Sequence, residues 1–518
     1  MNKLAQVVST DQSCLFPPGY RASGVLLHVT SLPSRFGIGD FGPEAIRWID
    51  TLADGGQSWW QILPIGPTGA GNSPYTPLST FACNPLLISP EGLIDEGLLR
   101  DDECVPLAFS EGHVDFSSVI PYKKVLLDIA WKRFTEGGFP TLASAMNAFS
   151  KTEARWLDDF ALFVVLKQRF GGISYVDWPV EYVKRDVAAL DHIRLELNEE
   201  IGRVKWEQLI CFRQLSRLRQ HAARRAVRLF GDIPIFVSAD SADVWAHPNI
   251  FQLDENRRPR LVAGVPPDYF SATGQLWGNP VYDWAELKRT GYDWWIDRLR
   301  SLLGHHDVIR LDHFRGFSAA WHVPAGAPTA ETGEWIEGPG ADFFTELRQQ
   351  LGGLPFVAED LGTITDDVRQ LLADFRFPKM SVLQFAFDQD ERNAFLPHNT
   401  VENMIAYTGT HDNDTSRGWY HELSHENRAY FWRYIGCEER PESEVAEIMI
   451  DMAWSSRAAV AIAPMQDLLN LDSKSRMNIP GVADGNWSWR CSHEQMSRIT
   501  WDHFRNLTHR TNRFLNKP

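Results

Sequence analysis

Three acidic segments follow short apolar runs in the second half of this 518-residue chain. They contain Asp312, Glu359 and Asp412. Each carboxylate comes where an apolar run ends, which is where active-site residues leave the strands of an α/β barrel. Burying several carboxylates together is costly unless a site uses them. Their convergence on one barrel mouth would therefore indicate catalysis rather than surface decoration.

Paired carboxylates in an apolar cleft can carry out glycoside chemistry: one attacks the anomeric carbon, and the other protonates the leaving oxygen and then deprotonates the incoming hydroxyl. Period-2 alternation places Arg310 beside Asp312, where it should lower the pKa of Asp312 and keep this predicted nucleophile anionic. Taken alone, Arg310 and Asp312 are better explained as a buried structural ion pair. Apolar surroundings and a nearby carboxylate should raise the pKa of Glu359, the predicted acid/base. Asp412, with His411 beside it, could bind sugar hydroxyls and favour distortion toward the transition state.

Aromatic residues are abundant, with 20 Trp, 30 Phe and 12 Tyr. Most must belong to the core, because aromatic side chains bury large areas. The remainder could line a cleft, since an indole face matches the C–H face of a sugar ring. This is consistent with a glycan substrate.

Eight apolar runs that end in polar, Gly or Pro residues are predicted to be strands: 24–29, 59–65, 228–237, 307–313, 355–361, 380–387, 403–412 and 457–466. Several are apolar on both faces, as parallel strands covered by helices must be. Helical patterns over 43–54 and 366–375 lie between them. We therefore expect an α/β fold, a single (β/α)8 TIM barrel spanning 1–518, with the active site at the carboxyl ends of its strands.

Two insertions are expected in this barrel. Residues from about 86 to 226 would form a mainly helical subdomain between the second and third strands, with helical patterns over 154–168 and 185–228. Its Arg-rich stretch could bind phosphate, but a solvated helix face is favoured. The connection from about 238 to 306 would carry a lid loop over 261–269, where Gly and Pro residues suit an ordered loop at the carboxyl-terminal face.

Composition excludes several classes of partner. Lys and Arg number 51 against 67 Asp and Glu, and the net charge of −16 disfavours binding to nucleic acid or to a membrane surface. Six widely spaced cysteines without a CxxC pair suggest neither a zinc site nor a disulfide framework. The start lacks a signal-peptide pattern, and no apolar run approaches the ~18 residues needed to span a bilayer. A cytoplasmic protein is expected.

Six motifs resemble those of the 4-α-glucanotransferases of the amylomaltase type, a family in the α-amylase clan of (β/α)8 enzymes. The resemblance covers about residues 24–490. The motifs are GVLLHVTSLPS at 24–34, GDIPI at 231–235, GVPPDYF at 264–270, IRLDH at 309–313, AEDLG at 358–362 and GTHDNDT at 409–415.

The resemblance implies roles for nine residues. Asp312 would be the nucleophile, Glu359 the acid/base and Asp412 the transition-state stabiliser. Four residues would surround the donor sugar: Tyr75, Asp232, Arg310 and His411. In the lid, Asp268 and Trp277 would bind neighbouring glucose units.

The implied reaction is transfer of an α-1,4-glucan segment to the 4-hydroxyl of an acceptor glucan or glucose. It would be a retaining double displacement with the two carboxyl groups roughly 5 to 5.5 Å apart. Maltooligosaccharides and α-1,4-glucans would be the partners, and no cofactor or metal would be required.

Four other functions are also considered for this sequence. An α-glucan hydrolase of the same clan is the main alternative, and a non-catalytic glycan-binding protein would also keep an aromatic cleft. The GxGxxG segment at 37–42 suggests a nicotinamide-dependent oxidoreductase, but it lacks the tight turn and the acidic residue of that site. A metal-dependent hydrolase could use His313, His411, Asp412 and Asp414, although such sites usually take a His-x-His pair from the first strand.

Overall fold

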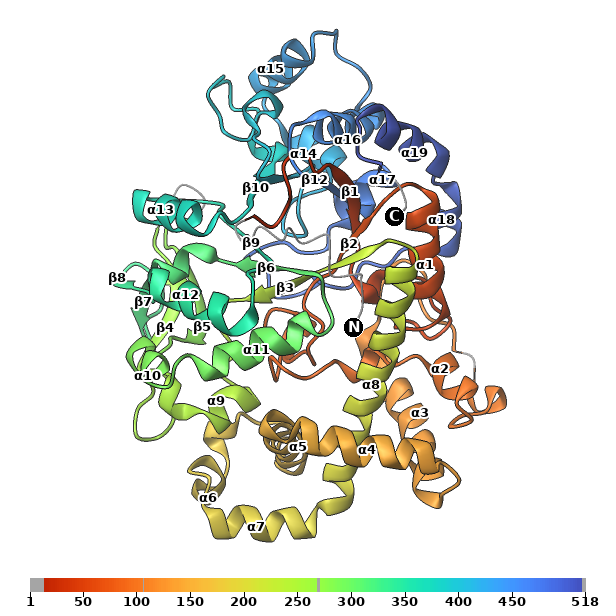
Figure 1. The fold of residues 1–518 in the computed structure, drawn as a ribbon, viewed down its shortest axis with the longest axis vertical. Helices are drawn as coiled ribbons and strands as arrows, with labels where there is room; N and C mark the ends of the chain where they lie inside the picture. The colour runs from red at the N-terminus through yellow and green to blue at the C-terminus, as the bar shows by residue number, and fades with distance from the viewer. Residues whose placement is uncertain (1–13, 106, 268–270, 515–518) are drawn as a thin grey trace.

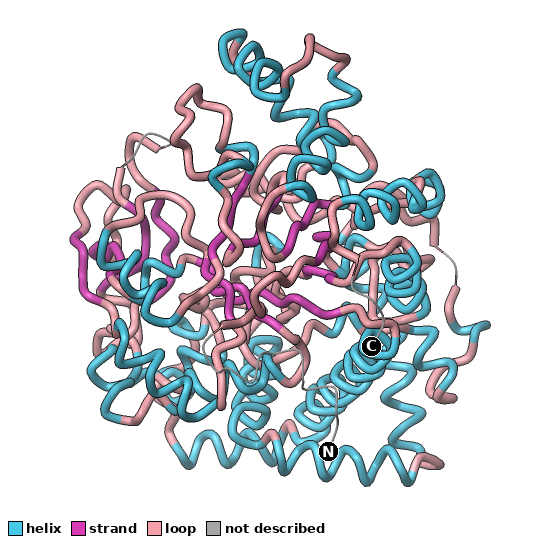
Figure 2. Tube along the Cα trace, turned by 45° about the horizontal axis from the view of Figure 1, so that its top comes forward, coloured by secondary structure: helices cyan, strands magenta, loops and turns pink. Residues whose placement is uncertain are grey.

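Eight parallel strands form a nearly closed barrel in the computed structural model, which describes residues 14–105, 107–267 and 271–514. In spatial order the strands are β10 Lys379–Val382, β11 Met404–Tyr407, β12 Val460–Pro464, β1 Ala22–Leu26, β2 Trp59–Gln61, β3 Arg228–Pro234, β6 Val308–Asp312 and β9 Phe356–Ala358. At the remaining seam, Ala358 N–H donates to the Pro378 carbonyl at 3.0 Å. Figure 2 shows these strands in the middle of the molecule with helices around them. The predicted (β/α)8 TIM barrel is confirmed.

All eight predicted runs overlap a barrel strand, but each strand ends earlier than predicted. The ladder of β3, for example, stops at Pro234 within the predicted 228–237 run. Beyond the last ladder bond the backbone leaves the sheet, and the apolar residues that follow pack in loops at the carboxyl-terminal face. Those loops carry the candidate site.

Helices cover the outside of the barrel. The predicted helices 43–54 and 366–375 are α1 Pro43–Asp54 and α13 Asp366–Phe375. Proline at the first position and glycines after the last bound α1, and its buried residues recur every three or four positions, so one stripe faces the strands. The other helices outside the insertion between β2 and β3 are α9 Ala242–Ala246, α10 Trp284–Arg289, α11 Asp293–Leu303, α12 Gly340–Leu351, α14 Ser416–Glu422, α15 His425–Ile435, α16 Val445–Ser455, α17 Met465–Leu468, α18 His493–Arg498 and α19 Trp501–Arg510.

A mainly helical insertion separates β2 from β3, as expected. It contains α2 Pro90–Asp95, α3 Phe116–Glu136, α4 Pro140–Thr152, α5 Ala154–Arg169, α6 Val180–Val183, α7 Val187–Glu196 and α8 Asn198–Arg224. Figure 1 shows α4 to α7 grouped at the bottom of the molecule, with α8 leading from them back to β3. The single pattern predicted over 185–228 divides at Leu197, where φ and ψ of −106° and 28° interrupt the helix.

The Arg-rich stretch of α8 is paired with carboxylates. Arg217 contacts Glu96 at 2.5 Å, and Arg225 contacts both Asp50 and Asp54 of α1. Arg217 thus pairs within the insertion and Arg225 attaches its end to the barrel helix α1, so these two guanidinium groups do not form a free phosphate-binding face.

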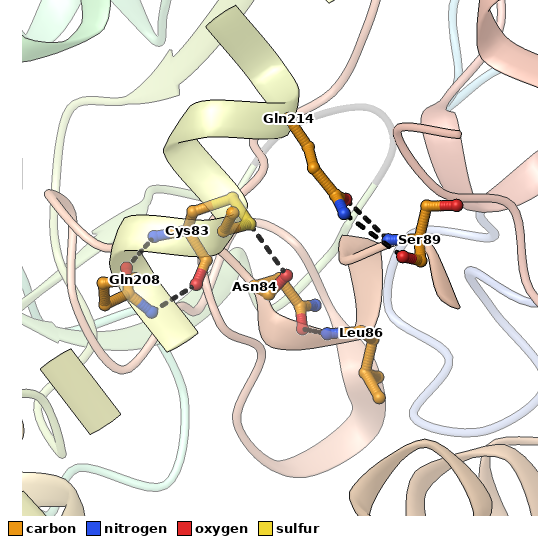
Figure 3. The surroundings of a disulfide bond; sticks show 7 residues. Cys83, Asn84, Leu86, Ser89, Gln208 and Gln214 are labelled. Atoms are coloured by element: carbon orange, nitrogen blue, oxygen red, sulfur yellow. Dashed lines mark hydrogen bonds between the residues drawn. A yellow bond between two sulfur atoms is a disulfide. The ribbon is translucent and has the colours of Figure 1, made fainter. Parts of the chain in front are cut away.

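Cys83 and Cys211 form a disulfide with their Cα atoms 6.3 Å apart. The cysteine spacing did not predict this disulfide, because 128 residues separate the two cysteines. They meet only because α8 returns past the segment that follows β2. Figure 3 shows that two glutamines of α8 support the same contact, since Gln208 hydrogen-bonds to the backbone of Cys83 and Gln214 to that of Ser89.

A second sheet, antiparallel and four-stranded, lies beside the barrel. It has the order β5 Gln275–Pro280, β4 Leu261–Val265, β7 Ala319–Pro324 and β8 Glu334–Glu337. Part of the region predicted as a lid loop is therefore strand. The sequence pattern did not predict β7 and β8, which follow the Asp312 segment in chain order. Both strands are short and mix polar with apolar residues, so they produce little periodic signal.

The GxGxxG segment holds a buried ion pair rather than a phosphate-binding turn. Lys123 of α3 contacts Asp40 at 3.0 Å, with side chains 1% and 6% exposed, and Asp40 also accepts from Gly42 N–H at 3.0 Å. The acidic side chain occupies the turn where a nucleotide-binding motif would need open backbone N–H groups.

Across the described part of the chain, we find no helix that is both long and apolar enough to cross a membrane.

Candidate active site

Neighbouring barrel strands bring Asp312 and Glu359 together. Asp312 is the last residue of β6, and Glu359 directly follows β9. The strands are in parallel register with Leu311 opposite Ala358, and Glu359 N–H donates to the Leu311 carbonyl at 3.0 Å. The two carboxylates therefore leave the sheet side by side at its carboxyl-terminal edge.

Arg310 joins Asp312 to a third carboxylate, that of Asp232. Its guanidinium donates to Asp232 at 2.6 Å and to Asp312 at 2.7 Å. Asp232 lies opposite Arg310 in the register of β3 and β6 and also accepts from the Tyr75 hydroxyl at 2.8 Å. The side chains of Arg310 and Asp232 are almost completely buried, at 4% and 0% exposed. Charge-assisted bonds of this kind fix the orientation of Asp312.

Glu359 is held by two backbone N–H groups. His313 N–H donates to one carboxyl oxygen and Leu361 N–H to the other, both at 2.8 Å. His313 adopts a left-handed backbone, with φ of 53°, that non-glycine residues seldom occupy. Burial, followed by the charge of Asp312, raises the pKa of Glu359 to about 7 against the opposing effects of Arg310 and these two N–H groups. Glu359, which was predicted to hold the proton, therefore has the raised pKa that this role requires.

The pKa of Asp312 differs from the expectation. Burial, together with the charges of Asp232 and Asp412, raises the pKa of Asp312 to about 6 against the opposing effect of Arg310. The predicted direction is wrong because Arg310 is shared with Asp232 and cannot offset both burial and the neighbouring carboxylates. Arg310 bonds directly to Asp312, which favours the charged form of Asp312 over that of Glu359.

Asp412 lies in the segment after β11 and has several polar partners. His411 contacts one of its carboxyl oxygens at 3.3 Å, and Asn478 donates to the other at 2.6 Å. Arg476 donates to the Asp412 carbonyl at 3.0 Å. Burial disfavours the charged carboxylate, but His411, Asn478 and Arg310 outweigh it and hold the pKa of Asp412 well below its ordinary value. Asp412 is thus the firmly anionic member of the three.

Aromatic rings lie at both ends of the carboxylate group. At one end, Tyr75 stacks on His411 with ring centroids 5.0 Å apart, and Trp487 lies 5.6 Å from Tyr75 and 6.0 Å from His411. At the other end, Trp277 meets the ring of His313 edge-on at 4.7 Å. Of the two residues assigned to the lid, Trp277 is on β5 and 37% exposed, whereas Asp268 falls outside the described residues.

Eight of the nine predicted site residues are therefore described, and they form one connected group. Three further residues that contact this group were not predicted: Arg476, Asn478 and Trp487. They belong to an irregular stretch after the last barrel strand, where a cluster of Gly, Pro and Trp was the one available signal.

The four residues considered for a metal do not converge. Asp414 accepts from Thr415 N–H and Ser473 Oγ, away from the Trp277 contact of His313. Across the ranges that the structure describes, no group of three or more His, Cys, Asp or Glu side chains could hold a metal ion.

Comparisons with known proteins agree with this geometry. A family model described as 4-alpha-glucanotransferase matches residues 27–496. A 4-alpha-glucanotransferase of Synechocystis is 47% identical over 92% of this chain and 95% of the relative, and one of Thermus thermophilus is 45% identical over 91% and 94%.

Solved structures give the same result. The amylomaltase of Streptococcus agalactiae in complex with acarbose superposes with a TM-score of 0.92 at 37% identity, covering 96% of this chain and all of the other. An amylomaltase of Corynebacterium glutamicum, at 21% identity and a TM-score of 0.76, shares the fold over 95% of this chain and 74% of its own. By its sequence, its fold and the family match over most of its length, the chain belongs to the 4-alpha-glucanotransferase family.

Proposed function

We propose that this enzyme transfers α-1,4-glucan segments by a retaining double displacement in which Asp312 and Glu359 act as a pair. The observation that carries the proposal is their position on paired strands, where the Arg310 guanidinium bonds to Asp312 and favours its ionised form, while burial and the charge of Asp312 raise the pKa of Glu359. Retaining glycosidases require this division between two neighbouring carboxyl groups.

In the first step, an oxygen of Asp312 attacks the anomeric carbon of the donor. The bond from that carbon to the 4-oxygen of the leaving segment breaks, and Glu359 gives its proton to that oxygen. In the second step, the 4-hydroxyl of an acceptor attacks the same carbon, Glu359 takes the hydroxyl proton, and the ester bond to Asp312 breaks. Two inversions leave the α configuration unchanged.

The surrounding residues support the charge that develops in these steps. Asp412, kept anionic by His411 and Asn478, lies where a carboxylate can stabilise an oxocarbenium-like sugar and bind its hydroxyls. Arg310 and Asp232 hold Asp312 and the Tyr75 hydroxyl in place. Tyr75 would lie under the reacting glucose, and Asp268 and Trp277 would bind units beside it.

Maltooligosaccharides are the proposed substrates. The Streptococcus agalactiae amylomaltase, which shares the fold over 96% of this chain, was solved in complex with acarbose. The exposed Trp277 and partly exposed Tyr75 and Trp487 supply ring faces of the kind that bind sugars.

Incubation with maltotriose tests the proposal. We expect free glucose and longer maltooligosaccharides to accumulate while the number of reducing ends stays almost constant, because each cleaved bond is replaced by a new one. A rise in reducing ends that matches glucose release would show hydrolysis, and no reaction would leave a glycan-binding role. The same reaction with a strong chelator should run at an unchanged rate; loss of activity would favour a metal-dependent enzyme.

A further inference from the structure

The two aromatic ends of the site differ in their relation to Glu359. At the Trp277 end, His313 contacts both residues: its backbone N–H donates to the Glu359 carboxyl, and its ring contacts the ring of Trp277. Under the proposed function, Glu359 must reach the oxygen that joins the attacked glucose to the leaving segment. Trp277 therefore lies on the side of the leaving segment and of the acceptor that replaces it.

Trp487 lies at the opposite end. Its ring contacts Tyr75 and His411, which are next to Asp412 and Asp232 rather than Glu359. A glucan that runs from Trp277 past Glu359 and over Tyr75 would continue toward this ring. Trp487 is only partly buried, so part of its surface remains accessible.

The position of Trp487 is built by the stretch 476–489, which we name the 476–489 loop. Trp487 N–H donates to the Met477 carbonyl at 2.7 Å, and Asn486 bonds to the backbone of Ile479 and Val482. Trp487 itself has a left-handed backbone, with φ of 63°, which a bulky residue rarely adopts. Such a conformation persists where the surrounding structure enforces it, often at ligand sites.

The same loop is anchored to the barrel and to Asp412. Ser31 Oγ donates to the carbonyl of Trp489, a buried residue, at 2.8 Å. Arg476 and Asn478 bind the carbonyl and the carboxylate of Asp412. The ring of Trp487 is thus fixed relative to the acid that faces the reacting sugar.

We infer that Trp487 is a donor-side binding residue that contacts the second glucose unit of the segment to be transferred. This inference rests on the proposed function and adds a specificity to it: donors that place two or more glucose units on the Asp412 side are favoured over donors that place one there.

Glycosyl fluorides separate this role from acceptor binding. α-Glucosyl fluoride places one glucose unit on the donor side and α-maltosyl fluoride places two, with the same leaving group. Fluoride release is measured for each at saturating glucose as acceptor, and the quantity compared is the ratio of kcat/KM for maltosyl over glucosyl fluoride. This ratio does not depend on the fraction of folded enzyme in a preparation.

Trp487→Ala should lower the ratio about tenfold, as expected for loss of a ring contact with one sugar. Trp487→Phe should keep most of the ratio, because a ring remains. Trp277→Ala should leave the ratio unchanged and raise the KM for glucose. Trp335→Ala, which removes a tryptophan of β8 that is 40% exposed and outside the site, should change neither quantity.

An unchanged ratio in Trp487→Ala would overturn the inference, as would a raised KM for glucose with a constant ratio, which would place Trp487 on the acceptor side. An equal loss of kcat with both fluorides would also overturn it, because Trp487 would then act on the chemical step. Failure of the unaltered enzyme to release fluoride from either donor would instead refute the proposed function.

Discussion

Glu359 lies beside Asp312 because their strands are paired in register, and a backbone N–H next to Asp312, that of His313, donates to the Glu359 carboxyl. The two acids are therefore positioned by main-chain geometry, which side-chain substitutions leave in place. Their roles can be tested by changing one carboxyl group at a time.

Asp312→Asn should abolish transfer while the fold is retained. An amide cannot form the covalent intermediate, and we expect maltotriose turnover to fall by about 10⁴-fold or more. The matched control is Asp366→Asn in the first turn of α13, where the side chain is 99% exposed. Turnover within tenfold of the unaltered enzyme would show that Asp312 is not the nucleophile.

Glu359→Gln should impair natural donors far more than activated ones. Cleavage of maltotriose needs a proton on the leaving oxygen, so its rate should fall by about 10²- to 10⁴-fold. Fluoride leaves without that proton, so α-maltosyl fluoride should still give a rapid burst of about one fluoride per active site, followed by slow turnover. Equal losses with both donors would contradict the acid role.

The pH dependence of kcat/KM should be bell-shaped. Activity requires ionised Asp312, so it should fall as the pH drops through about 6. It also requires protonated Glu359, so it should fall as the pH rises through about 7. Initial rates of glucose release from maltotriose between pH 4.5 and pH 9 would measure both limbs. A flat profile across that range would argue against this division of roles.

Glu359→Gln should also change thermal stability in a pH-dependent manner. The pKa of Glu359 in the folded protein is raised to about 7, so the neutral carboxyl is favoured by folding. Its contribution to stability is complete below the ordinary pKa of a glutamate and is lost as the pH rises through about 7. The variant should therefore melt about 1–3 °C above the unaltered protein at pH 8 and show no gain at pH 4.5. A gain of equal size at both pH values would point to altered packing instead.

Lys123→Ala should destabilise the protein strongly. The substitution leaves the buried Asp40 carboxylate without its charged partner, which costs about 3–5 kcal/mol. Lys288→Ala, which removes an exposed pair with Asp342, should cost less than about 1 kcal/mol. Denaturant unfolding compares the two variants. The double variant Lys123→Met with Asp40→Asn should recover much of the loss, and failure to do so would locate the effect in the lost bond from Lys123 Nζ to the Ile88 carbonyl rather than in the unpaired charge.

Sequence reasoning found the barrel and most of the site for a common physical reason. Parallel strands covered on both faces are apolar throughout, and the first polar residues after them lie at the active face. Asp312 and Glu359 are such residues. The same reasoning placed Arg310 beside Asp312 by alternation, and the structure shows that bond.

The remaining site residues lacked such a pattern. Arg476, Asn478 and Trp487 come from the 476–489 loop, where no periodicity links a residue to the direction of its side chain. Their partners, Asp412 and Tyr75, lie far away in the chain, so only the folded structure shows the contacts. The raised pKa of Asp312 was missed because it depends on how deeply the strand end is buried.

The first and last strands of the barrel are neighbours, with Ala22 opposite Val460, and Arg513 bonds to the carbonyls of both Ala22 and Ala459. During synthesis, β1 therefore leaves the ribosome long before β12, its partner on one edge, has been made. Its exposed edge must wait for almost the entire chain, since long-range parallel pairing forms late. The barrel of the newborn polypeptide can therefore close only after β12 has been translated.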